Sequence, residues 1–140
     1  MERLPLILIA DRNPNVRELL KREMHAQGYH ASTASDAARL FEHVSSMNPP
    51  DLVILDLDLP GAGPSGIIKE LKSRAPDIPV IVHTLVSDPV ALPEIKDTSG
   101  FVEKQGDSVE ELKRIVCDLL SREAGGPSAG AAGYTAQPDT

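Results

Sequence analysis

Cysteine is almost absent from this sequence. The single cysteine, Cys117, cannot form a disulfide within the chain, and no zinc-site spacing is present. Tryptophan is missing and aromatic residues make up only 3% of the chain, so few rings are available to stack on bases. The net charge of −7 also argues against phosphate backbones as partners. These absences predict a cytoplasmic protein that binds other proteins and no nucleic acid.

No apolar run is long enough to span a bilayer. The N-terminal run contains Pro5, meets a charge at Asp11 and lacks the cleavage pattern of a signal peptide, so we predict no membrane segment. The 140 residues suffice for one domain with one core. Beyond residue 122, Gly, Ala, Pro and Ser dominate without an apolar period. We therefore predict a folded domain at residues 1–122 and a flexible tail at residues 123–140.

Short apolar runs alternate with amphipathic stretches along the chain. This alternation is typical of repeated βα units and predicts an α/β fold with a mostly parallel sheet. The first, third and fourth runs are almost continuously apolar, as expected of central strands covered by helices on both faces. The predicted strands are residues 4–10, 29–34, 52–55, 80–83 and 100–103.

Caps and apolar stripes mark the predicted helices. Asn13 and Pro14 predict the start of the first helix, and Gly28 predicts its end. Ser108 with Glu111 three residues later predicts a capping box at the start of the last helix. Two further helices are predicted at residues 35–47, with Ala38, Phe41 and Val44 inward, and at residues 65–74, with Ile67, Ile68 and Leu71 inward.

The fourth connection differs from the others. Residues 87–98 contain Pro89 and Pro93, each of which removes a backbone donor and crowds the preceding turn. We therefore expect the fourth helix to be short or irregular.

Four polar residues lie at the ends of four different predicted strands. Asp11, Asp56, Thr84 and Lys104 each follow a strand directly or are its last residue. Taken singly, each could be a solvated loop residue. In an open parallel sheet, however, ligands bind outside the carboxyl ends of the strands, where the winding direction reverses. The joint pattern therefore predicts one pocket.

These residue types suit transfer of a phosphoryl group to a carboxylate. A carboxylate can attack phosphorus and form an aspartyl phosphate when the charge of the incoming group is neutralised. A Mg²⁺ ion held by one or two carboxylates, a lysine ammonium and a hydroxyl donor can do this. Asp11, Lys104 and Thr84 match these helper roles around Asp56. Such roles do not make the protein a turnover enzyme.

Four segments resemble the receiver domain of two-component response regulators. They are LILIADRNPNVRELL at 6–20, DLVILDLDLPG at 51–61, PVIVHT at 79–84 and GFVEK at 100–104. The resemblance implies a flavodoxin-like doubly wound sheet of five parallel strands in the order 2-1-3-4-5, with helices on both faces. It also implies a stand-alone phosphorelay module, a monomer or weak homodimer, that takes phosphate from a histidine kinase or phosphotransfer protein and switches its affinity for a downstream protein.

The resemblance assigns a role to each residue of the pocket. Asp56 is the phosphoacceptor, and Lys104 contacts the phosphoryl group. Mg²⁺ is held by Asp11, Asp56 and Asp58, the last through its backbone carbonyl. The implied switch pair is Thr84 and Phe101.

Arg12 departs from the family pattern, which usually has a second acidic residue here. Losing a carboxylate and adding a cation weakens Mg²⁺ binding. Alternatively, the guanidinium stands where the metal would, pairing with Asp11 and Asp56. A third possibility is that Arg12 points into solvent. The side chain of Asp58 could also replace the missing ligand.

Two more departures surround the pocket. Leu85 stands where the family favours a small residue, which predicts narrower access to Asp56. Gln105 replaces the usual proline after Lys104, so the turn that aims the lysine must differ or be strained. These changes favour an alternative function, a pseudo-receiver that binds partners without phosphorylation.

Two other features are weaker signals. Residues 61–66, GAGPSG, match a dinucleotide-binding pattern, which would make the protein a nucleotide-dependent enzyme, but a turn beside the pocket is the plainer explanation. His83 precedes Thr84 on the same strand, so alternation points its side chain away from the pocket and predicts a packing role.

Overall fold

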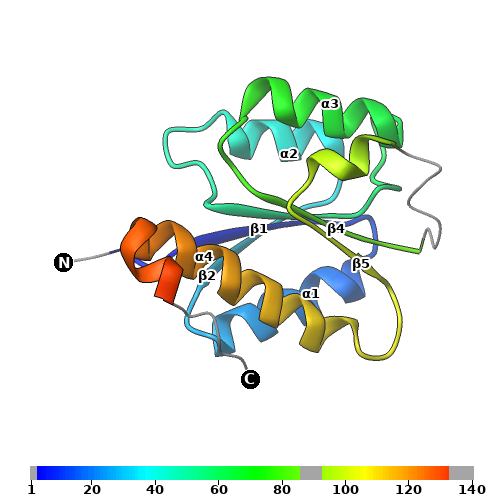
Figure 1. The fold of residues 1–140 in the computed structure, drawn as a ribbon. Coiled ribbons are helices and arrows are strands. Elements are labelled where there is room, and N and C mark those ends of the chain that lie inside the picture. Colours follow the sequence, from blue (N-terminus) through cyan, green and yellow to red (C-terminus); the bar gives the residue numbers. More distant parts are fainter. Residues whose placement is uncertain (1–2, 86–92, 133–140) are drawn as a thin grey trace.

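The structure is a computed structural model that describes residues 3–85 and 93–132. Five parallel strands form one sheet in the order β2-β1-β3-β4-β5. Helices α1 and α4 cover one face, and α2 and α3 cover the other (Figure 1). The predicted flavodoxin-like architecture and strand order are confirmed. The elements are β1 Leu6–Ala10, α1 Pro14–Ala26, β2 His30–Ala34, α2 Ala37–Val44, β3 Leu52–Leu55, α3 Pro64–Arg74, β4 Val80–Thr84, the 3₁₀ helix η2 Pro93–Asp97, β5 Gly100–Glu103 and α4 Ser108–Ala132.

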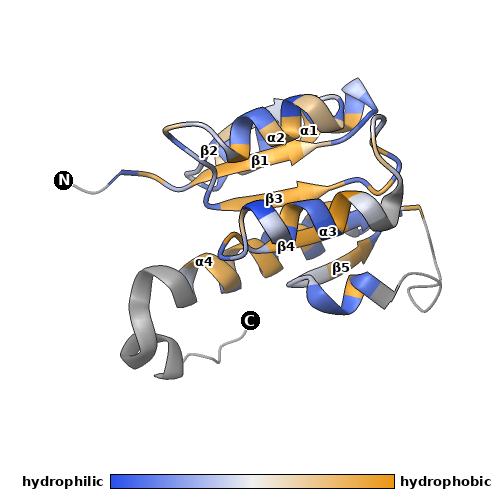
Figure 2. Ribbon diagram, turned by 90° about the horizontal axis from the view of Figure 1, so that it is seen from above, coloured by the Kyte–Doolittle hydropathy of each residue, from blue (hydrophilic) through white to orange (hydrophobic). Residues whose placement is uncertain are grey.

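Each face of the sheet has its own hydrophobic core. Successive side chains of a strand point to opposite faces, so Leu8 and Ala10 pack toward α2 and α3, whereas Ile7 and Ile9 pack toward α1 and α4. Strands β1 and β3 are apolar along their whole length (Figure 2), and β4 is apolar up to His83 and Thr84 at its end. Strands β1, β3 and β4 are therefore the buried ones, as their nearly continuous hydrophobicity predicted.

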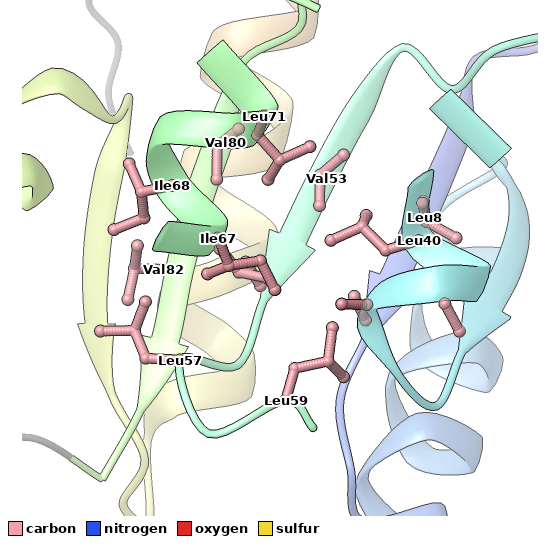
Figure 3. Close-up of a cluster of buried hydrophobic side chains, with 14 of the residues drawn as sticks. Leu8, Leu40, Val53, Leu57, Leu59, Ile67, Ile68, Leu71, Val80 and Val82 are labelled. Carbon is pink, nitrogen blue, oxygen red and sulfur yellow. The ribbon is translucent and has the colours of Figure 1, made fainter. Parts of the chain in front are cut away.

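The loop after β3 is anchored in the core beneath α2 and α3. Leu57 and Leu59 are each 1% exposed and join Leu40 and Ile67 in this cluster (Figure 3). Burying a leucine side chain contributes about 1.5–3 kcal/mol. The buried side chains of Leu57 and Leu59 thus anchor the loop. Asp58, which lies between them, is thereby held at the edge of the sheet.

The first helix forms as predicted. Asn13 is its N-cap, with a side chain that accepts a hydrogen bond from the Asn15 N–H, and Pro14 is the first helical residue. The chain leaves the helix through Gly28, whose φ of 95° lies in the left-handed region that favours glycine.

The second helix is shorter than predicted. It begins after Asp36, whose side chain accepts a hydrogen bond from the Arg39 N–H, rather than at Ser35. The inward face is predicted correctly in part, since Val44 is buried and Phe41 packs against the core. Ala38, predicted to be inward, is exposed, and Leu40 is buried instead. Serine and aspartate are both good N-caps. Local preference therefore does not decide whether Ser35 or Asp36 caps the helix.

The last helix begins differently from the predicted capping box. Ser108 is its first residue and is buried, and the carbonyl of Asp107 accepts the Glu111 N–H. The hydroxyl of Ser108 lies 3.1 Å from Nε2 of His83 on β4. A buried imidazole needs a hydrogen-bond partner, and here the helix-terminal serine provides it.

Helix α4 also extends past the predicted end of the domain. It runs to Ala132, ten residues beyond the boundary at residue 122. The composition of this segment did not predict a helix, because Gly125, Gly126, Pro127 and Gly130 all have low helix propensity. The predicted flexibility of the tail remains a prediction, and residues 133–140 lie outside the described residues.

The fourth connection contains only a short helical piece in the described residues. Pro93–Asp97 forms the 3₁₀ helix η2, in agreement with the short or irregular helix predicted there. Residues 86–92, which include Pro89, lie outside the described residues. Over residues 3–85 and 93–132, no helix has the length and apolarity needed to cross a membrane.

Gly61 is the tightest point of the turn between β3 and α3. Its φ is 108°, and a Cβ added there would lie 3.1 Å from Cβ of Ala37. Gly66 lies within α3 and has nothing within 4 Å of an added Cβ. Backbone geometry therefore accounts for the glycine at position 61 without a nucleotide.

These two glycines should respond oppositely to alanine. Gly61→Ala should lower the free energy of unfolding by about 1–2 kcal/mol, because a left-handed conformation is costly for residues with a Cβ. Gly66→Ala should raise it by about 0.5–1 kcal/mol, because alanine is the better helix former. Urea denaturation of both variants checks this. A neutral Gly61→Ala would show that the turn does not require positive φ.

Candidate functional site

Parallel pairing brings the predicted pocket residues to one edge of the sheet. The N–H of Asp56 donates to the carbonyl of Ala10 at 2.8 Å, and the N–H of Lys104 donates to the carbonyl of Thr84 at 2.7 Å. These bonds continue the strand pairing by one residue beyond β3 and β5. The backbone of each site residue is therefore set by the sheet itself.

Lys104 joins the two buried acids. Its Nζ lies 2.9 Å from Oδ2 of Asp11 and 3.6 Å from Oδ2 of Asp56. Asp11 and Asp56 are 2% and 1% exposed. Removing one partner from a buried ion pair typically costs about 3–5 kcal/mol, because the remaining charge stays desolvated. The lysine therefore supports both carboxylates.

The turn at Gln105 delivers Lys104 without a cis peptide. All peptide bonds in the described ranges 3–85 and 93–132 are trans, and Gln105 is exposed. Lys104 thus reaches both acids although Gln105 stands where the family usually has proline.

Backbone N–H groups also converge on the acids. Oδ1 of Asp56 accepts the Asp58 N–H at 3.1 Å, and Oδ2 accepts the Arg12 N–H at 3.3 Å. Oδ1 of Asp11 accepts the Asn13 N–H at 2.9 Å. The carboxylate of Asp56 is consequently held in one orientation by donors that are part of the backbone.

The two acids also repel each other. Burial raises the pKa of Asp11, and the negative charge of Asp56 raises it further, while the Asn13 N–H and Lys104 oppose this rise. On balance the pKa of Asp11 lies above its ordinary value, and the ammonium of Lys104 favours its ionised form.

Arg12 lies over the pocket. Its Nε is 3.7 Å from Oδ2 of Asp56, and its Nη2 donates to Oδ2 of Asp58 at 3.3 Å. The alternative in which Arg12 points into solvent is therefore wrong, and its second partner is Asp58 rather than Asp11. With the side chain 48% exposed, these contacts are worth only about 0–1 kcal/mol.

As the side chains stand, the acids that would hold a divalent cation are already paired with positive side chains, and this pairing does not fit such an ion. Lys104 contacts Asp11 and Asp56, and Arg12 contacts Asp56 and Asp58. A cation entering here meets two positive charges, and unit charges about 4 Å apart repel by about 4 kcal/mol at an effective dielectric constant of about 20.

The other predicted site residues surround this centre. Thr84 is fully buried, and its hydroxyl has no hydrogen-bond partner among the described residues. Phe101 on β5 is half-buried and packs against the core beneath α2 and α3. Leu85 is 60% exposed, so the predicted narrowing of access by this residue remains a prediction.

Arg17 is a neighbour of the site that the sequence did not reveal. Its Nη1 donates to the carbonyl of Asp11 at 2.7 Å. The only available signal was its position on the first turn of α1, one turn after Asn13. This contact ties α1 to the end of β1.

A separate hollow lies away from these residues. It has a volume of about 370 Å³, and Ile78, Ser99 and Leu119 are among its lining residues. Two lining residues, Pro79 and Ser99, immediately precede β4 and β5, so the hollow is at the amino ends of these strands. In open α/β sheets ligands bind at the carboxyl ends, and the ionic cluster is there.

The sequence matches a known family over most of its length. Residues 7–116 match the response regulator receiver domain. The chain belongs to this family. The match includes Asp11, Asp56, Thr84 and Lys104, so the ionic cluster lies within the conserved domain of the family and at the edge where its sheet binds ligands.

Solved receiver structures resemble this one closely. TrrA from Thermotoga maritima, in complex with Mg²⁺-BeF, has a TM-score of 0.76 and 32% identity, and the match covers 84% of this chain and all of TrrA. TrrA in complex with the histidine kinase ThkA gives a TM-score of 0.75 and 33% identity over 84% of this chain and 100% of that chain. The match thus covers the whole of TrrA and 84% of this chain.

Curated relatives are longer proteins. Response regulator MprA from Mycobacterium sp. (strain KMS) is 33% identical over 78 residues, covering 56% of this chain and 34% of MprA. DNA-binding transcriptional regulator NtrC from Escherichia coli (strain K12) is 29% identical over 83 residues, covering 59% of this chain and 18% of NtrC. The matched region therefore spans about a third of MprA and less than a fifth of NtrC.

His83 lies behind the pocket of the receiver domain. It is 3% exposed, and its Nδ1 has no hydrogen-bond partner among the described residues. Burial lowers the pKa of His83 to about 4, and the positive charge of Lys104 lowers it further while Asp56 opposes the shift. The ring is therefore neutral near pH 7 and serves as a packed partner of Ser108, the role that strand alternation predicted.

This burial should make stability fall in acid. Between about pH 6.5 and about pH 4 the unfolded chain binds a proton at His83 that the folded chain does not, so stability decreases as pH falls. The loss should approach about 3 kcal/mol, since one pKa unit equals about 1.36 kcal/mol. Urea denaturation across this range should show a flatter pH dependence for His83→Gln than for wild type. His25→Gln, at an exposed position on α1, is the control, and an unchanged slope in His83→Gln would contradict the assignment.

Proposed function

We propose that this receiver domain accepts a phosphoryl group on Asp56 in a two-component phosphorelay. One observation carries the proposal: Asp56 is 1% exposed at the carboxyl end of a central strand, yet its carboxylate is surrounded by Lys104, Arg12 and two backbone N–H groups. A buried carboxylate with converging donors suits charge that develops during phosphoryl transfer.

The proposed step is a displacement at phosphorus. A carboxylate oxygen of Asp56 forms a bond to phosphorus, and the bond from phosphorus to the donor atom breaks, with the electron pair leaving on the donor. With an acyl phosphate the leaving group is a carboxylate, and with phosphohistidine it is the imidazole, which takes up a proton. Lys104 offsets the added negative charge and Thr84 supplies a hydroxyl donor. The domain itself turns over no substrate.

The partners follow from the family and the similar structures. Because TrrA, 33% identical, is seen in complex with the histidine kinase ThkA, we assign a histidine kinase or phosphotransfer protein as the phosphoryl source and a second protein as the downstream target. The proposed location is the cytoplasm, and the proposed assembly is a monomer or weak homodimer. Mg²⁺ accompanies BeF in the TrrA structure, and Asp11, Asp56 and the Asp58 carbonyl are the groups that would hold it if Arg12 moved away.

Intact-mass spectrometry tests the phosphoacceptor. Incubation with acetyl phosphate, with and without Mg²⁺, should add the mass of one phosphoryl group to wild type and none to Asp56→Asn. Asp77→Asn, which makes the same chemical change at an exposed residue before β4, should gain mass as wild type does. Labelling of Asp56→Asn would assign the phosphate to another residue.

The proposed switch can be followed with fluorine. The chain contains only two phenylalanines, Phe41 and Phe101, so fluorophenylalanine labelling gives one probe on β5 and one internal control beside Arg74, whose guanidinium carbon lies 4.7 Å from the Phe41 ring. Phosphorylation should draw in the Thr84 hydroxyl and let Phe101 repack. Fluorine NMR should therefore show a shift at Phe101 and little at Phe41. Thr84→Val should be phosphorylated without this shift, and a shift that persists would remove Thr84 from the switch.

A pseudo-receiver is the alternative function. It is favoured by the Arg12 contacts, because Asp56 and Asp58 are already paired with a cation before any phosphate arrives. In that case the fold would present a binding surface without covalent modification. A wild-type protein that gains no mass with any donor, with or without Mg²⁺, would support this alternative.

A further inference from the structure

Arg12 delivers two different donors to the same carboxylate. Its backbone N–H donates to Oδ2 of Asp56 at 3.3 Å, and its Nε lies 3.7 Å from that oxygen. The backbone here is fixed, because the next residue, Asn13, donates its N–H to Asp11 and caps α1. The side chain, in contrast, is 48% exposed, so the guanidinium is tethered at the pocket but free to follow a group that enters.

The charge of Arg12 matches that of a metal-loaded site. A carboxylate at position 12 together with one divalent cation would carry the same formal charge as one guanidinium. Replacing an acid by arginine thus shifts the local charge as much as binding Mg²⁺ does. This pocket already has that positive charge, supplied by a side chain, whereas the described residues contain no metal-ligand cluster.

The chemistry of the guanidinium also fits a phosphoryl group. Arginine presents several N–H donors in a planar fork that matches phosphate oxygens, and it stays ionised at any physiological pH. Two further donors lie at the same sheet edge, the ammonium of Lys104 and the unpartnered, fully buried hydroxyl of Thr84. Two cations and a hydroxyl are therefore available to an incoming phosphoryl group without a metal.

We propose that Arg12 replaces the divalent cation, so that Asp56 is phosphorylated independently of Mg²⁺ and the guanidinium holds the phosphoryl oxygens. This proposal rests on the proposed function. In the transfer, a carboxylate oxygen of Asp56 bonds to phosphorus, the acyl leaving group departs with its electron pair, and Arg12 turns from Asp58 toward the new phosphoryl oxygens. The charge of the added group is offset by Arg12 and Lys104, and no proton is transferred when the donor is an acyl phosphate.

The test compares four forms of the full chain by intact mass, incubated with acetyl phosphate in either Mg²⁺ or EDTA. Wild type should be labelled at equal rates in both. Arg12→Gln should be slower in both on the order of tenfold to a hundredfold, the usual effect of losing a charge-assisted hydrogen bond. Arg12→Asp should be labelled only with Mg²⁺. Arg22→Gln, which removes the same charge from an exposed position on α1, should behave as wild type.

Thermal unfolding with Mg²⁺ gives a second readout that does not need phosphorylation. Millimolar Mg²⁺ should leave the melting temperature of wild type unchanged and raise that of Arg12→Asp, because a ligand stabilises the folded state that binds it. The same melts show whether each variant folds. Stabilisation of wild type by Mg²⁺ to the same extent as Arg12→Asp would overturn the proposal.

The failures can be told apart. Labelling of wild type only with Mg²⁺ would show that Arg12 gives way to a metal, which overturns this inference and leaves the proposed function intact. Labelling of Arg12→Asp with Mg²⁺, but of wild type under neither condition, would show that Arg12 blocks the site and would support the pseudo-receiver. No labelling of any form would remove both proposals.

Discussion

Two buried carboxylates at neighbouring strand ends are the constraint on which this site depends. Asp11 and Asp56 follow adjacent strands, both are almost fully buried, and each raises the free-energy cost of ionising the other. They remain together because Lys104 contacts both, and because backbone N–H groups occupy the other oxygens.

The position of the two acids is set by strand pairing and core packing, not by the conformational preference of each residue. Parallel pairing sets the backbone of each site residue, and Leu57 and Leu59 anchor the loop that carries Asp56 and Asp58 in the core. On the other side, Ser108 ties the start of α4 to His83 on β4. The hydrophobic cores on both faces of the sheet therefore hold the site in place. A displacement of side chains in either core would shift Asp11 and Asp56.

Arg12 combines two consequences of one substitution. It pairs with Asp56 and Asp58, and it places a positive charge beside both carboxylates, which disfavours another cation at short range. The contacts are weak, since the side chain is half-exposed and screened by water. Weak pairing is compatible with either phosphoryl transfer or phosphate-free binding, and the difference lies in how readily the guanidinium leaves Asp58 for another anion.

The sequence by itself determined the elements and the order of the polar residues. Apolar runs revealed five strands, the near-continuous ones were the central strands, and Asn13, Pro14 and Gly28 marked the first helix, because hydrophobic period and cap chemistry are local properties. The strand order came from the resemblance to receiver domains and was confirmed. At the start of the second helix, Ser35 and Asp36 are both suitable N-caps, and local preference does not distinguish them.

Only the tertiary structure decided which side chains that are distant in the sequence come into contact. Arg12 reaches Asp58, 46 positions away, and Ser108 turns from the predicted cap to His83, 25 positions away. In the sequence, Leu57 and Leu59 could not be told from other apolar residues, and only the packing of α2 and α3 over them shows that they anchor the loop. Such contacts depend on the packing of distant segments, and burial and charge balance there outweigh the preferences of each residue taken alone.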